Sequence, residues 1–218
     1  MKQKINWSNH FIELIVVVIG ISIAFMLDNW NQERENQKLE QKYLNSFKND
    51  IVSDASRLDS TIIGVENKLN IIGKYINEVK NGKASIEKAE VIIPHLLATY
   101  GFSPKQTTFQ SLTNNGALNL VSDYKLKEEI VSYYYYYEEL KIKEQVLYDY
   151  LLAFVLPYVY KNVDFLSGEI VNKAVPNSFE FKNIVTSYFI LVRQNQEVYK
   201  EYKLESSELL KSINQKLD

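Results

Sequence analysis

An apolar run near the N-terminus constrains the fold of this chain more than any other feature. Residues 11–27 read FIELIVVVIGISIAFML, in which Glu13 is the only charged residue. At a rise of about 1.5 Å per residue this run is about 26 Å long, just enough for a helix to cross the hydrocarbon core of a bilayer. Trp7 and Trp30 flank the run, as aromatic anchors at the two membrane interfaces do. We therefore predict a transmembrane helix with its interfacial residues over 11–30.

The charges on either side of the run predict its orientation. Lys2 and Lys4 precede it with no acidic residue among the first ten, whereas residues 28–37 carry three acids and one arginine. The positive-inside rule then leaves residues 1–10 as a cytoplasmic tail and places the rest of the chain outside.

A cleaved signal peptide is the alternative to a retained anchor. Ser22-Ile23-Ala24 is a small-x-small pattern of the kind that precedes cleavage. Glu13 would then lie inside the apolar region of the signal, and the run continues past the cleavage point to Leu27, so the retained anchor is favoured.

Three residues of the run are candidates for packing against another membrane helix. Gly20 and Ala24 form a small-xxx-small pair that lets a second helix approach closely. Glu13 is an ionisable group in hydrocarbon, which usually meets a partner or water. Two plainer interpretations stay open: small residues are common in spans, and Glu13 can reach the headgroups.

The remaining sequence predicts an all-α fold. Seven Gly and four Pro are few for 218 residues, and residues 31–50 are polar and rich in helix formers, so we expect the span to continue outward as a stalk. A heptad seam follows at Ile51, Ala55, Leu58, Ile62, Val65, Leu69, Ile72, Ile76 and Val79. The seam can close against another copy or against later helices of the same chain. Matching later seams favour an antiparallel bundle over residues 51–218.

Capping and breaking residues predict four further helices, over about 86–100, 104–115, 124–160 and 178–218. Their N-caps are expected at Ser85, Ser103, Ser122 or Asp123, and Asn177. In the 124–160 helix, Glu144 occupies the one polar position of the apolar seam.

Five consecutive tyrosines, residues 133–137, mark that helix. Successive side chains point about 100° apart, so Tyr134, Tyr135 and Tyr136 must partly face away from the seam. Either neighbouring helices cover them or they form an exposed aromatic patch suited to partner binding.

The composition and motifs give little support for an enzymatic activity or a metal site. The chain has no Cys, two His and a net charge of −2, which argues against thiol or thiolate-metal sites and against nucleic-acid binding. Phosphate loops, zinc-protease pairs and nucleophile elbows do not occur. We expect no catalytic residue, no cofactor and no metal site.

The N-terminal block, FIELIVVVIGISIAFMLDNWNQERENQKLEQKYL, resembles the opening of an uncharacterised membrane-anchored family common in Bacteroidota, known as a domain of unknown function. The matching residues are Glu13, Gly20, Ala24, Asn29, Trp30 and Asn31, and Asp28 stands where the family has Asn. A looser match runs from Thr108 to Tyr134. The resemblance implies a retained anchor and a helical ectodomain, and it brings no activity with it.

Together these features predict a single-pass protein of the bacterial inner membrane, with its N-terminus in the cytoplasm and a helical bundle in the periplasm. We expect a non-enzymatic interaction or scaffold protein whose partners are the lipid bilayer and another envelope membrane protein, or a second copy of itself. The alternative is an accessory sensory subunit whose bundle binds a ligand and signals through a partner membrane protein.

Overall fold

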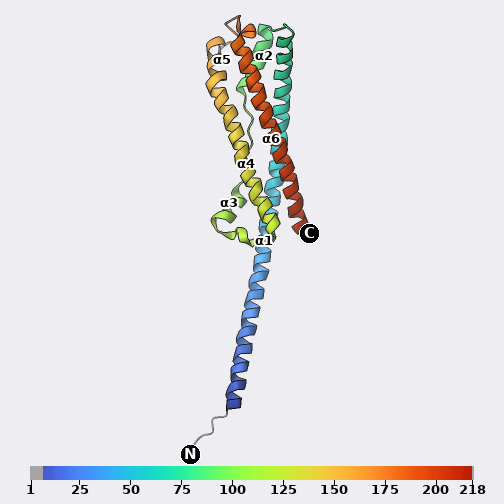
Figure 1. Ribbon diagram of the computed structural model, residues 1–218, viewed down its shortest axis with the longest axis vertical. Helices are drawn as coiled ribbons and strands as arrows, with labels where there is room; N and C mark the ends of the chain where they lie inside the picture. The colour runs from blue at the N-terminus through green and yellow to red at the C-terminus, as the bar shows by residue number, and fades with distance from the viewer. Residues whose placement is uncertain (1–6, 218) are drawn as a thin grey trace, which may run out of the picture.

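The structure is a computed structural model that describes residues 7–217, with side chains from Phe11 onward. It confirms the all-α prediction (Figure 1). Most of the predicted tail, residues 1–10, lies outside the described residues, as does the side chain of Trp7. The elements are α1 (Trp7–Lys80), α2 (Ile86–Leu97), α3 (Thr107–Asn114), η1 (Ala117–Leu120), α4 (Tyr124–Tyr150), η2 (Leu151–Val155), α5 (Leu156–Asn162), η3 (Val175–Asn177) and α6 (Phe179–Leu217).

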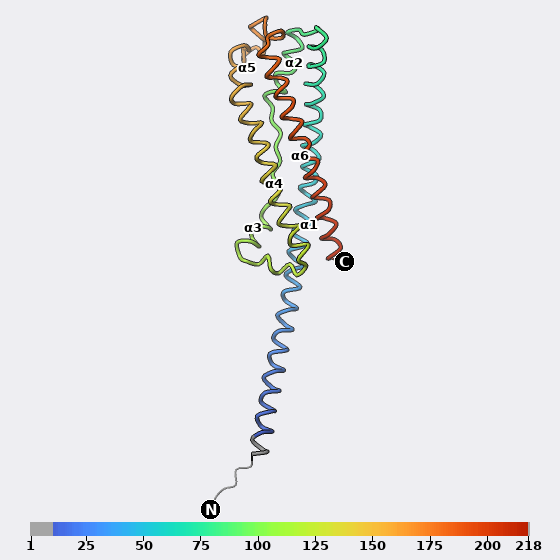
Figure 2. Tube along the Cα trace, viewed as in Figure 1, coloured from blue at the N-terminus to red at the C-terminus, as the bar shows by residue number. Residues whose placement is uncertain are grey.

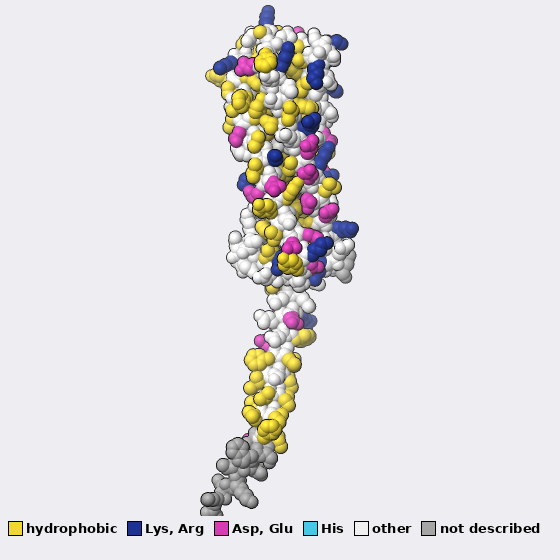
Figure 3. Space-filling view, in the orientation of Figure 1, with side chains coloured by type: hydrophobic (Ala, Val, Ile, Leu, Met, Phe, Trp, Pro, Cys, Tyr) yellow, Lys and Arg dark blue, Asp and Glu magenta, His cyan; other side chains and the backbone are white. Residues whose placement is uncertain are grey.

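Helix α1 is unbroken over 74 residues, about 110 Å. Every side chain from residue 11 to residue 39 is exposed, and burial begins at Glu40. Leu44 and Phe47 are then buried within the bundle, so packing starts inside the range 31–50 that we predicted as a stalk. Among the described residues, α1 alone is long and apolar enough to cross a membrane. Figure 3 shows its apolar side chains in yellow on the part of the helix that lies below the bundle.

The chain passes along the bundle four times. Helix α1 runs from the base, where it enters the bundle, to the far end, and α2 with residues 98–106 returns to α3 and η1 at the base. Helix α4, continued by η2 and α5, then rises, and α6 descends to end beside α1 (Figure 2). The α1 seam packs mainly against α6, which also packs against α4, so the seam closes within the chain.

The buried face of α1 differs from the predicted seam at Asp54 and Lys68, and also at Tyr75, which is buried where the half-buried Ile76 was predicted. Ile51, Leu58, Val65 and Ile72 are buried as expected. Asp54 and Lys68 are also buried, at 1% and 2% exposure, whereas the neighbouring positions Ala55 and Leu69 are only half-buried. Asp54 and Lys68 are buried because this side of α1 faces the polar backbone of residues 98–106 rather than the apolar face of another helix.

The helix ends confirm some predicted caps and correct others. The side chains of Ser85 and Asp123 cap α2 and α4 by accepting backbone N–H groups, as predicted. Helix α2 ends at Leu97 rather than near residue 100, and α3 begins at Thr107 rather than at residue 104. Both differences arise because residues 98–106 have no regular secondary structure and their backbone is held by side chains of other helices. The N-cap of α6 is Ser178, whose Oγ accepts the Phe181 N–H at 3.2 Å, and not Asn177.

The predicted helix over 124–160 contains a wide turn of π-helix, η2, that ends two residues before Pro157. Proline has no N–H to donate, and its ring clashes with the carbonyl four residues earlier in a regular α-helix. A local π turn relieves that clash while the helix continues to Asn162.

Candidate functional site

The three candidate packing residues of the apolar segment share one face of α1. Spacings of seven and four residues place Glu13, Gly20 and Ala24 within about 40° of one another around the helix. All three are exposed, and a Cβ added at Gly20 would meet nothing within 4 Å. On the opposite face Ser22 donates its hydroxyl to the Val18 carbonyl at 2.8 Å. The Gly20 face is therefore open to a second helix.

Trp30 lies where the apolar segment gives way to polar helix. Its side chain is 60% exposed, and the Arg34 guanidinium lies 5.8 Å from the centre of its ring. Every side chain from Leu27 to residue 39 is exposed, and Glu33, the first residue that lines the groove at the base of the bundle, lies about 9 Å beyond Leu27 along the helix. A headgroup layer is about 5–7 Å thick on each side of the hydrocarbon core, so the base of the bundle would stand clear of it.

The polar interior of the bundle surrounds residues 98–106, an extended segment that we call the strap. The strap connects α2 to α3 along the bundle (Figure 2), and side chains of α1, α4 and α6 bind its backbone. Phe102 and Pro104 point inward and are buried, whereas Ser103 and Lys105 are exposed. Backbone groups outside regular structure need partners of their own, and the long helices supply them as side chains.

At the upper end of the strap the ammonium group of Lys68 donates to the Ala98 carbonyl and to the Tyr188 hydroxyl oxygen, the latter at 3.0 Å. It also lies over the rings of Tyr100 and Tyr188, at 5.1 and 5.3 Å from their centres. Burial lowers the pKa of Lys68 to about 8.

In the middle of the strap, Glu144 of α4 accepts the Phe102 N–H at 2.8 Å and the Tyr199 hydroxyl at 2.6 Å. Burial raises the pKa of the Glu144 carboxyl, against the lowering effect of these two hydrogen bonds. The polar position that interrupted the predicted seam thus has a partner on the strap.

At the lower end, both carboxylate oxygens of Asp54 accept the Lys105 N–H, at 3.2 and 3.0 Å. Arg57 donates to the same carboxylate at 2.5 Å and to the Ser103 carbonyl at 2.8 Å. Lys68, Glu144 and Asp54 therefore bind backbone groups of the strap, and we assign these charged side chains a structural role. Sequence reasoning missed Asp54 and Lys68 because their partners lie 51 and 30 residues away along the chain.

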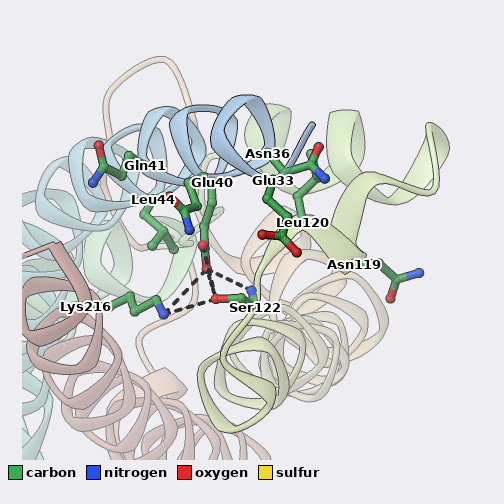
Figure 4. A pocket seen from close by; sticks show the side chains of 10 residues that line it. Glu33, Asn36, Glu40, Gln41, Leu44, Asn119, Leu120, Ser122 and Lys216 are labelled. Atoms are coloured by element: carbon green, nitrogen blue, oxygen red, sulfur yellow. Dashed lines mark hydrogen bonds and ion pairs between the residues drawn. The ribbon is translucent and has the colours of Figure 1, made fainter. Parts of the chain in front are cut away.

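A second polar cluster lies at the base of the bundle, in a groove of about 450 Å³ between α1, η1 and α6 (Figure 4). The buried carboxylate of Glu40 accepts the backbone N–H and the hydroxyl of Ser122, at 2.8 and 2.9 Å. Lys216 lies 4.0 Å from that carboxylate and donates to Ser122 Oγ at 3.1 Å. These contacts join the entry of α1, the start of α4 and the end of α6, so Glu40 is engaged within the fold.

The three candidate tyrosines of α4 have different surroundings. Tyr134 is buried, stacks on Phe109 with 4.2 Å between ring centres and donates to the Lys105 carbonyl. Tyr136 is half-buried and donates to Glu201 at 2.7 Å. Tyr135 is 71% exposed. Of the two possibilities that the sequence left open, burial under neighbouring elements holds for Tyr134, which meets α3 and the strap, and partly for Tyr136, whereas Tyr135 alone of the three faces fully outward.

An exposed apolar cluster also covers the far end of the bundle. It borders a groove of about 650 Å³ between α5 and α6. In Figure 3 yellow side chains gather over this end. Its exposed members include Phe154, Tyr160, Phe165, Leu166 and Phe179.

This geometry defines a class: a helical bundle carried on one long N-terminal helix whose first part is apolar enough to span a membrane. The chain belongs to a family of unknown function, DUF6090, whose model matches residues 13–193. That match includes Glu13, the face of Gly20 and Ala24, the strap and most of the bundle. Among curated proteins and among solved structures, none matches the chain significantly.

Proposed function

We propose that this protein is a single-pass, non-enzymatic interaction or scaffold protein of the inner membrane, with its N-terminus in the cytoplasm and its bundle in the periplasm. It binds another envelope membrane protein through the face of Glu13, Gly20 and Ala24 and through an outward face of the bundle near Tyr135. The continuity of α1 carries this proposal. One unbroken helix fixes the bundle at a set height and rotation above the membrane, which is what a positioning protein requires.

The polar interior supports a non-enzymatic role. Asp54, Lys68 and Glu144 are the buried or half-buried charges at the centre of the bundle, and each is bound to the strap backbone. The alternative, an accessory sensory subunit, calls for a pocket in which several polar groups converge on a ligand. In the groove at the base, the Glu40 carboxylate already binds Ser122, which favours the interaction role.

The partner interaction is tested by changing the size of one face of the span. Gly20→Ile together with Ala24→Ile should remove the partner that copurifies with the full-length protein in mild detergent, because bulky side chains block close helix approach. Ser22→Ile is the matched control, since it enlarges a small residue on the opposite face. If both variants retain the partner equally, the span does not bind it. Glu13→Leu tests the charged group in the same assay.

Orientation and retention of the anchor are tested separately. The chain contains no Cys, so single cysteines can be labelled without background. A membrane-impermeant maleimide should label Ser167→Cys in cells with a permeabilised outer membrane, and Lys4→Cys only after the inner membrane is opened. The reverse pattern would overturn the orientation, and an intact mass short by 24 residues would show cleavage after Ala24.

A further inference from the structure

Exposed apolar side chains line the outward face of α4. Tyr135 and Ile142 are 71% and 63% exposed, and Tyr124, Val131 and Val146 are exposed as well. At about 100° per residue, these five residues lie within about 40° of Tyr135 around the helix. We call them the α4 stripe. It is about 33 Å long and follows the opposite side of the helix from the core seam of Ile130, Tyr133, Tyr137 and Leu140.

Such a stripe is specific to α4 among the long helices. Within the packed part of α1, from residue 40 to residue 80, the exposed large apolar side chains are Val52 and Ile63, and in α6 they are Phe179, Ile190 and Leu204. Those sets are sparser, with steps of 11 and 14 residues, whereas the members of the α4 stripe are seven and four residues apart. An amphipathic helix normally has one apolar face, and α4 has two. The second face has the pattern of a helix that packs against a further helix.

The charges beside the stripe are acidic. Glu128, Glu139 and Asp149 are exposed and lie within about 40° of Tyr135, between the apolar members of the stripe, and Glu138 lies about 60° away. The lysines of α4 lie about 80° or more away. Lys141 is 3.6 Å from Glu138, and Gln145 donates to Asp149. Glu128 and Glu139 add further negative charge on the same side. The stripe is therefore an apolar strip within an acidic surface.

The acidic surface decides between a second copy and a different partner. Under the proposed function, copies share one membrane and one helix length, so their α4 helices stand parallel at equal height. A two-fold contact through the stripe would bring each carboxylate near its own counterpart, and like charges at an interface oppose association. A partner helix with Lys or Arg beside its apolar seam would meet these carboxylates favourably.

We propose that the α4 stripe is the docking surface for an amphipathic helix of another envelope protein, with an apolar seam flanked by basic residues. The stripe runs along the bundle axis, so the partner helix lies beside the bundle and rises from the membrane parallel to α4. This inference rests on the proposed function and adds to it the place and the chemistry of the ectodomain contact.

Photo-crosslinking in native cells tests the proposal with the full-length protein. Benzoylphenylalanine is placed at Tyr135 or at Ile142, and at Ile63 as the control, because Ile63 is a 59% exposed apolar residue on α1. Positions 135 and 142 should give an adduct with another protein that position 63 does not give. Mass spectrometry should place the adduct on a peptide with apolar residues every three or four positions and flanking Lys or Arg.

Charge reversal supplies the second measurement. Glu138→Lys with Glu139→Lys, both on the surface, should lower the adduct yield at least fivefold while the helical circular dichroism and the melting temperature stay unchanged. The proposal would be overturned by an adduct with a second copy, by an adduct with lipid alone or by the absence of an adduct. It would also be overturned if charge reversal left the adduct yield unchanged. Copurification through the span, tested with Gly20→Ile and Ala24→Ile, is independent of these variants. A retained span partner with no α4 adduct would refute this inference and leave the proposed function standing.

Discussion

Gly64 of α1 lies directly beneath the ring of Tyr100. A Cβ at position 64 would come within 2.3 Å of the Tyr100 Cε1 atom, closer than any real contact. Tyr100 belongs to the strap and also covers the ammonium group of Lys68, 5.1 Å from its ring centre. The absence of a side chain at 64 thus allows the strap to lie close to α1.

Gly64→Ala should therefore lower stability by about 1 kcal/mol, because displacement of the Tyr100 ring outweighs the gain in helix propensity. Gly73→Ala is the control: its Cβ would meet the Phe189 ring at 3.4 Å, and it should be neutral or stabilising by up to about 1 kcal/mol. Thermal unfolding of the full-length protein in mild detergent measures both. In a Tyr100→Ala background the cost of Gly64→Ala should disappear. An equal cost in both backgrounds would contradict the contact.

Lys68 should give the protein an unusual rise of stability in mild alkali. The pKa of Lys68 is about 8 in the folded protein against 10.5 for a free lysine, so between these values the unfolded chain binds more protons. Stability then increases with pH across this window, up to about pH 10, where buried tyrosines with raised pKa values, such as Tyr133 and Tyr188, reverse the trend. The melting temperature followed from pH 7 to 10 should rise in the wild type. In Lys68→Met the rise should be absent, and a rise of equal size there would assign it to another group.

Removal of the Asp54 carboxylate should be costly. Asp54→Ala leaves the Lys105 N–H and the Arg57 guanidinium without their buried acceptor, and we expect a loss of about 3 kcal/mol. Asp59→Ala is a matched change on the same helix, since Asp59 makes a half-exposed ion pair with Lys203 at 2.6 Å. It should cost less than about 1 kcal/mol. Unfolding midpoints of the two variants give the comparison, and similar losses would mean that the strap does not depend on Asp54.

Adjacent alanine substitutions before α6 locate its cap. Ser178→Ala removes the acceptor of the Phe181 N–H and a hydroxyl 2.9 Å from that of Tyr158, so a loss of about 1 kcal/mol is expected. Asn177→Ala changes an exposed residue and should leave the melting temperature nearly unchanged. A larger effect at 177 than at 178 would restore the sequence-based cap.

Local patterns predicted the helices and most of the core, because periodic apolar residues and caps act over a few positions. Ile51, Leu58 and Val65 illustrate this. The end of α2 at Leu97 was not predictable in the same way. The segment after Leu97 leaves the helical conformation because side chains distant in the sequence bind its backbone. The residues around position 97 carry no pattern that predicts these contacts.

The candidate site shows the same limit. Periodicity placed Glu13, Gly20 and Ala24 on one helix, and their spacing puts them on one face. It could not separate Tyr134 from Tyr135, because the outcome depends on the positions of Phe109 and the Lys105 carbonyl. Neighbouring positions on a helix differ by about 100°, so one contact with another element decides which residue is buried.

The contact of Lys216 with Glu40 and Ser122 has a practical consequence for anyone who fuses a reporter to this protein. The chain leaves the bundle at the same end at which α1 enters it. A fluorophore or tag attached after Leu217 would therefore lie at the base of the bundle, close to the point where α1 enters it. A probe for the opposite pole must be inserted in the exposed turn around Ser167 and Gly168.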